Sequence, residues 1–155
     1  MKTIRALFAT SSLLIMSSFI LASFSRPTGG EGFEIYLNSK LVVQQFGSQI
    51  NNVKSIQLDA GSANDELTIK YYHCGQAGKN RSLAIKDDQG KILKEWHFAD
   101  VTGGKAEMTC KVKDIVGLKK TNGTVTLNLY YSCNELPKGR HLASLVVGTL
   151  NMAKL

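Results

Sequence analysis

Residues 124–132, Thr-Val-Thr-Leu-Asn-Leu-Tyr-Tyr-Ser, alternate polar and apolar side chains along most of their length. The apolar side chains of Val125, Leu127, Leu129 and Tyr131 occupy every second position. Successive side chains of a β-strand point to opposite faces, so this spacing predicts a strand with one buried face. Val, Thr and Tyr are also enriched in strands, which supports the same prediction.

Segments of this kind recur along the chain, separated by clusters of Gly, Asn and Asp. The expected strands are 33–37, 40–46, 53–58, 66–73, 82–86, 91–98, 107–115, 124–132 and 141–147. Asn122-Gly123 is typical of a hairpin turn and would join the seventh of these strands to the eighth. Short strands at near-regular spacing predict an all-β fold, an antiparallel β-sandwich of immunoglobulin-like or related topology with about eight or nine strands.

The first 25 residues have the pattern of a secretory signal peptide. Two basic residues precede an apolar run at 6–22, which ends in the small residues Ser23 and Ser25. This pattern predicts cleavage after residue 25 and a periplasmic or extracellular location. The alternative is a membrane anchor, but the run is short for a spanning helix and contains several hydroxyl residues. We therefore expect a mature protein that is not embedded in a membrane.

The remaining residues, 26–155, suit one domain. The chain has a formal net charge of +7, and the signal holds two of its 19 basic residues and none of its 12 acidic ones, which leaves +5. A balance of this size is compatible with an extracytoplasmic protein or an anionic glycan as partner. It does not indicate nucleic acid, because no basic stripe interleaved with aromatic residues is present.

Residues 53–84 and 112–143 align at an offset of 59 with ten identical pairs. The densest part is Tyr-Tyr-x-Cys-x4-Lys-x-Arg-x-Leu-Ala, found twice without a gap. This pattern predicts a duplicated strand–loop–strand unit. The apolar alternation of the first copy includes Tyr71, whereas that of the second includes Tyr131, one position out of phase. Either one copy contains a β-bulge, or the two strands bury opposite faces.

The repeat also places a lysine and an arginine two residues apart in each copy, at Lys79 and Arg81 and at Lys138 and Arg140. Alternate residues of an extended segment point the same way, so each pair can clamp a carboxylate, sulfate or phosphate. The alternative is that the four are solvated side chains that protect sheet edges. Our first hypothesis is a non-catalytic binding or protein-interaction module that contacts an anionic group through these four residues.

The chain has three cysteines, which allow at most one intramolecular disulfide. A four-residue turn between strands 107–115 and 124–132 would place Cys110 opposite Cys133, so we expect that bridge. A Cys74–Cys133 bridge, a Cys74–Cys110 bridge and no bridge at all are the alternatives.

A second hypothesis is a soft-metal protein that binds copper. Thiolate, thioether and imidazole groups suit this ion, and they occur at His73, Cys74, Met108, Cys110 and Cys133. The sequence has no Cys-x2-Cys or His-x3-His spacing, and His73 and Cys74 would point to opposite faces of one strand. We therefore expect no cofactor.

A third hypothesis is an enzyme of unidentified class. The sequence has no Gly-x-Ser-x-Gly or His-Glu-x-x-His motif, so we do not expect an enzyme. Catalysis would need a concave site that gathers His97 or His141 with acidic residues. Asn80 and Asn122 begin Asn-x-Ser/Thr patterns, which are acceptors for N-glycosylation where that pathway exists.

Overall fold

The structure is a computed structural model that describes residues 30–74, 76–101, 106–119 and 123–148 of the 155-residue chain. The expected signal peptide, its cleavage site and Asn122 lie outside the described residues. The described helices are the turns η2 (Gly47–Gln49) and η3 (Ala60–Asn64) and the short helix α2 (Val112–Val116). None of them has the length and apolar character of a bilayer-spanning helix.

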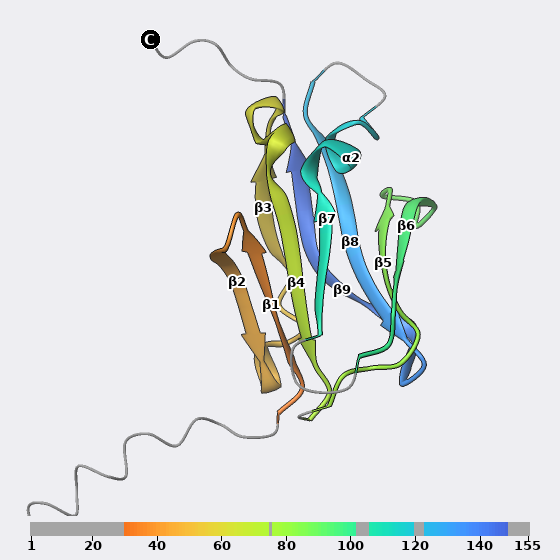
Figure 1. The fold of residues 1–155 in the computed structure, drawn as a ribbon. Helices are drawn as coiled ribbons and strands as arrows, with labels where there is room; N and C mark the ends of the chain where they lie inside the picture. The colour runs from red at the N-terminus through yellow and green to blue at the C-terminus, as the bar shows by residue number, and fades with distance from the viewer. Residues whose placement is uncertain (1–29, 75, 102–105, 120–122, 149–155) are drawn as a thin grey trace, which may run out of the picture.

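The described residues form nine strands in two sheets (Figure 1). The four-stranded sheet has the order β2-β1-β4-β7 and consists of β1 (Gly32–Leu37), β2 (Lys40–Phe46), β4 (Glu66–Tyr72) and β7 (Glu107–Lys111). The five-stranded sheet has the order β3-β9-β8-β5-β6 and consists of β3 (Lys54–Leu58), β5 (Arg81–Lys86), β6 (Ile92–Phe98), β8 (Val125–Cys133) and β9 (Leu136–Val147). The prediction of an all-β fold is confirmed.

The strands pair antiparallel, as expected, with one difference. Strand β3 pairs parallel with β9, with Ile56 opposite Leu145. Both side chains are buried, so β3 contributes to the inner, core-facing side of its sheet. A parallel pair needs a long connection rather than a hairpin, and here the whole of β4 to β8 lies between the two strands.

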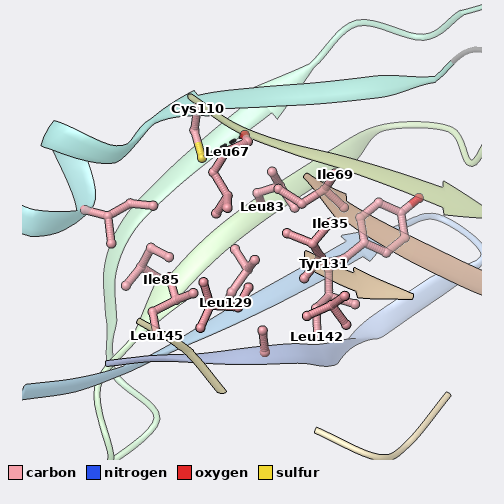
Figure 2. Packing of buried hydrophobic residues seen from close by; sticks show 14 of the residues in the cluster. Ile35, Leu67, Ile69, Leu83, Ile85, Cys110, Leu129, Tyr131, Leu142 and Leu145 are labelled. Carbon is pink, nitrogen blue, oxygen red and sulfur yellow. Dashed lines mark hydrogen bonds between the residues drawn. The ribbon is translucent and has the colours of Figure 1, made fainter. Parts of the chain in front are cut away.

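The inner faces of the two sheets share one hydrophobic core (Figure 2). Ile35 and Ile69 from the four-stranded sheet and Leu83 and Leu129 from the five-stranded sheet are fully buried within it. These residues come from the alternating positions that predict one buried face per strand. Burying each such side chain stabilises the fold by about 1.5–3 kcal/mol. The core therefore joins the two sheets, and it fixes which residues of each strand face away from it.

The segment 107–115 was expected to be one strand but forms two elements. Strand β7 ends at Lys111, and α2 follows. Val112 and Ile115 are both fully buried, and a spacing of three residues puts two side chains on one face of a helix but on opposite faces of a strand. The backbone N–H of Val112 donates to the carbonyl of Asp65 at 3.0 Å, which holds the start of α2 against the end of η3.

The expected hairpin between 107–115 and 124–132 is also wrong. Strand β7 pairs with β4 in one sheet, whereas β8 pairs with β5 and β9 in the other. Neighbours in the sequence thus belong to different sheets.

The two copies of the repeat do not occupy equivalent places. The strands of the first copy, β4 and β5, lie in different sheets, whereas those of the second, β8 and β9, are neighbours in one sheet. The phase difference is also resolved, because β4 buries Tyr71 and β8 buries Tyr131, and these are not aligned positions. The two rings stack across the core with centroids 4.2 Å apart. The aligned strands therefore bury opposite faces.

Candidate functional site

Arg81 is 2% exposed, and its guanidinium group binds backbone atoms. Nη1 donates to the carbonyl of Ala106 at 2.9 Å, and Nη2 donates to that of Ala99 at 2.7 Å. A buried guanidinium group is stable only with such partners. Arg81 therefore anchors the segments after β6 and before β7, and its planar fork is not free for a ligand.

Arg140 has a fuller set of partners than Arg81, whose buried Nε atom has none among the described residues. Its Nε donates to the hydroxyl of Tyr71 at 2.7 Å, its Nη1 to the side chain of Asn51 at 2.7 Å, and its Nη2 to the carboxylate of Glu31 at 3.1 Å. These bonds connect β9 to β4 and to the residue before β1. Of the four predicted ligand-binding residues, only Lys79 and Lys138 are exposed. The structure thus does not form the two Lys–Arg clamps.

The two repeated loops nevertheless lie side by side. The N–H of Asn134 donates to the carbonyl of Lys79 at 2.9 Å, and the N–H of Lys79 donates to the carboxylate of Glu135 at 3.0 Å. The N–H of Lys79 lowers the pKa of the Glu135 carboxyl, because it binds the charged form. Next to this contact, the N–H of Asn80 donates to the carboxylate of Asp100 at 2.7 Å. The loops β4–β5 and β8–β9 therefore form one fixed surface.

A hollow of about 390 Å³ opens beside these loops, on the face of the five-stranded sheet that points away from the core. We call it the polar hollow. Its lining residues come from β5, β6, β8, the start of β9 and the two loops and are Asn80, Ser82, Glu95, His97, Ser132, Cys133, Asn134 and Pro137.

These side chains face the hollow because successive residues of a strand point to opposite faces of the sheet. Leu83 and Tyr131 are in the core, so their neighbours Ser82 and Ser132 point to the opposite face. The two strands pair with Ser82 opposite Ser132, and their hydroxyl groups lie 2.7 Å apart. Ser82 is buried, at 5% exposure, and Ser132 is half-buried.

Strand β6 adds an imidazole and a carboxylate to the same face. His97 pairs with Ser82, and Glu95 lies two residues earlier on the same strand. The Nε2 atom of His97 is 3.8 Å from a Glu95 oxygen. The His97 side chain is 71% exposed, and among the described residues no hydrogen bond joins it to Ser82. The structure thus brings His97 together with an acidic residue, but not as the base of a serine nucleophile.

A second contact of chemically reactive side chains lies behind the hollow. The Nε2 atom of His73 is 3.3 Å from Cys133 Sγ and 3.0 Å from the Tyr131 hydroxyl. Burial lowers the pKa of His73 and raises the pKa of Cys133. Both shifts favour the neutral forms, so this is a contact between a thiol and a neutral imidazole and not a thiolate–imidazolium pair.

The five predicted metal ligands are dispersed. Met108 and Cys110 are buried in the core, Cys74 is exposed on the turn after β4, and only His73 and Cys133 touch. Within the described ranges, no group of three or more His, Cys, Asp or Glu side chains can hold an ion.

The expected Cys110–Cys133 disulfide is not formed. All three cysteines, each of which lies in the described part of the chain, are free thiols. The expectation rested on the hairpin, but Cys110 is on β7 and Cys133 ends β8 in the other sheet. Cys110 instead directs its thiol at the carbonyl of Leu67, 3.7 Å away (Figure 2).

His141, the other candidate for a catalytic group, lies outside the polar hollow. Its ring stacks on Tyr130 with centroids 4.8 Å apart, and burial lowers its pKa. The Nζ atom of Lys86 lies 4.2 Å from the Tyr130 ring centre. These three side chains cover one another on the outer face of the five-stranded sheet.

A larger hollow of about 510 Å³ lies where β5 turns into β6. It is lined partly by leucine and valine side chains such as Leu93, Leu118 and Val125. Its lining residues include none of the predicted site residues. It therefore supports no function here.

Sequence reasoning missed Ser82, Glu95, Ser132 and Asn134 as site residues. Each looked like an ordinary outward-facing or loop residue, and only the neighbouring positions of β6, β5 and β8 bring them together. The one available signal was the repeat itself, because its two loops supply Asn80 and Asn134.

No protein-family model matches the chain, and no curated protein matches it.

Proposed function

We propose that this chain is a non-catalytic binding module and that the polar hollow holds a small, uncharged, hydroxyl-rich ligand of the saccharide class. The observation that carries the proposal is the convergence of hydroxyl, amide, carboxylate and imidazole groups on one hollow. Ligand pockets typically have volumes of about 300–1,000 Å³, and 390 Å³ lies within this range.

The chemistry of the lining favours a ligand with many hydroxyl groups. Each hydroxyl of such a ligand can both donate and accept hydrogen bonds. The serine hydroxyls and asparagine amides of the hollow can also do both. The ionised carboxylate of Glu95 can only accept hydrogen bonds, so it pairs with hydroxyl groups that donate. The hydroxyls of Ser82 and Ser132 already pair with each other at 2.7 Å, and each keeps a further hydrogen-bonding position for a ligand hydroxyl.

An anionic ligand is less well supported than an uncharged one. Arg81 and Arg140 use their guanidinium groups inside the protein, and Glu95 places a negative charge in the wall of the hollow. Lys79 and Lys138 are exposed on the flanking loops and are the positive charges left for an anionic substituent.

We further propose that the two sheets form an immunoglobulin-like β-sandwich, that the repeat records an internal duplication, and that the protein acts outside the cytoplasm. The shared core supports the first point. The ten identical pairs support the second, and the basic, apolar and small-residue pattern of residues 1–25 supports the third.

The test is a titration of the isotope-labelled mature protein with neutral mono- and disaccharides, followed through backbone amide signals in NMR spectra. We expect saturable shifts at residues 80, 82, 132 and 134. Asn134→Ala should weaken binding, because it removes a lining amide, whereas Asn52→Ala should not, because Asn52 is exposed and does not line the hollow. If no neutral saccharide gives a saturable shift, or if only sulfated saccharides do, the proposed ligand class is wrong.

A further inference from the structure

The two sheets formed by the described residues end in four outer strands, β2, β7, β3 and β6. Three of them carry charges along their length or are short. Strand β6 contains Lys94, Glu95 and His97, and β7 and β3 have five residues each and begin with Glu107 and Lys54. Charged side chains and short length are two of the means by which natural sheets keep their edges from pairing with other chains.

Strand β2 has neither of these two protections, although a bulge at Val42 interrupts its pairing with β1. It has seven residues, and its one charged residue, Lys40, is the first. The remaining six, Leu41 to Phe46, are uncharged and contain neither Pro nor Gly. Leu41, Val42 and Phe46 are 43%, 37% and 36% exposed, and they are three of the six large hydrophobic residues exposed in the described part of the chain. An exposed apolar strand at an edge is a template for another strand.

The side chains of β2 are fixed before any partner arrives. Val43 and Gln45 are buried on the inner face, 6% and 3% exposed, so Gln44 and Phe46 face outward. The ring of Phe46 lies over Gly32, where a Cβ atom would come within 2.1 Å of it. It also packs on Tyr72 with centroids 5.7 Å apart. An aromatic group that is already ordered binds a partner at low entropic cost.

We propose that β2 pairs antiparallel with β2 of a second copy of this chain, with the two-fold axis at Gln44. In this register Val43 lies opposite Gln45 of the second copy. The inner faces of the two strands therefore lie on the same side of the joined sheet. Val42, which is the extra residue of a bulge against β1, lies beside Phe46 of the second copy. Pairs of aromatic and β-branched side chains are favourable across strands. The interface is closed and symmetric, and it joins two four-stranded sheets into one.

The charge pattern favours the antiparallel over the parallel pairing of two copies. The two Lys40 residues would be eight positions apart along the ribbon, or about 27 Å at about 3.4 Å per residue. That separation exceeds the screening length of about 8 Å at physiological salt. Parallel pairing would instead place the two lysines next to each other. An acidic partner would find only one positive charge on β2, so charge complementarity does not favour it.

The test is the mass of the mature protein in sedimentation velocity runs from about 1 µM to about 1 mM. We expect a monomer–dimer equilibrium in the wild type. Gln44→Glu puts two carboxylates face to face on the two-fold axis, each beside the Glu34 carboxylate of its own chain, and should raise the apparent dissociation constant about tenfold or more. The fold should survive, because the Gln44 side chain is exposed. Ile92→Lys on β6, where Ile92 is 50% exposed, is the matched control and should dimerise as the wild type does.

The register has a separate readout. Gln44→Cys in a Cys74→Ser background should form an intermolecular disulfide on mild oxidation, whereas Ile92→Cys in the same background should not. A wild type that stays monomeric throughout the concentration range overturns the proposal. So does a dimer that survives Gln44→Glu, because β2 then cannot be the interface.

Discussion

At the scale of single residues, Gly78 shows how tightly the loop after β4 packs on the thiol–imidazole contact. A Cβ atom at this position would lie 2.6 Å from the Tyr131 hydroxyl and 3.0 Å from both Cys133 Sγ and His73 Nε2. Tyr131 is fully buried and cannot move aside. We therefore expect Gly78→Ala to lower the free energy of unfolding by about 1–3 kcal/mol in urea titrations.

The control for this prediction is Gly30→Ala, because nothing lies within 4 Å of the Cβ position there. This variant should unfold at the wild-type urea concentration. If Gly78→Ala is as stable as Gly30→Ala, the loop does not pack on Tyr131 as the structure shows.

His73 makes the stability of the protein depend on pH. Burial holds its pKa below that of the unfolded chain, which is about 6.5. As the pH falls, the unfolded state takes up the proton before the folded state does, so the stability present above about pH 6.5 is lost on acidification. We expect the urea midpoint to fall between about pH 7.5 and pH 5.5, and to fall less in His73→Gln.

His141 has a pKa lowered by burial as well, so His73→Gln should leave part of the slope in place. The control is His97→Gln, which alters a side chain that is 71% exposed. An unchanged slope in His73→Gln would mean that the His73 ring is solvated and that its contact with Cys133 is not maintained.

At the scale of elements, α2 is the segment where local sequence preference and packing disagree. Residues 112–116 contain two valines and one isoleucine, which favour strands. Both Val112 and Ile115 are nevertheless buried in the common core, and only a helical turn puts them on one side. We expect Ile115→Ala to destabilise the protein by about 2–4 kcal/mol, measured by urea unfolding. Lys113→Ala changes an exposed residue of the same turn and should have little effect. Equal losses in the two variants would contradict the helix.

The strands could be predicted because apolar and polar residues alternate within each segment, whatever the rest of the chain contains. Their pairing could not, because it depends on contacts between distant residues. The turn residues Asn122-Gly123 favoured a hairpin, yet β7 pairs with β4 through contacts such as Ile69 opposite Met108, 39 positions apart in the sequence. For the same reason the alternation predicts that Ser82 and Ser132 face away from the core, but only the β5–β8 pair brings them together.

At the scale of the whole molecule, the two sheets keep the three thiols in different surroundings. Cys110 is 3% exposed in the four-stranded sheet, and burial raises its pKa to about 12. Cys133 ends β8 in the five-stranded sheet, is 5% exposed, and has a pKa that burial also raises. Cys74 is exposed on the turn after β4. Because the thiolate is the reactive form, the two buried thiols should resist alkylating reagents as long as both sheets stay packed on the core.

We therefore expect one modification, at Cys74, when the native protein is treated with iodoacetamide, and three when it is first unfolded without reductant. Intact mass and peptide mapping check both numbers, and Cys74→Ser is the control that should remain unmodified in the native state. One modification in both states would mean that Cys110 and Cys133 are bridged. A bridge there would require the end of β8 to reach β7 across the core, so it would contradict the division of the strands between the two sheets.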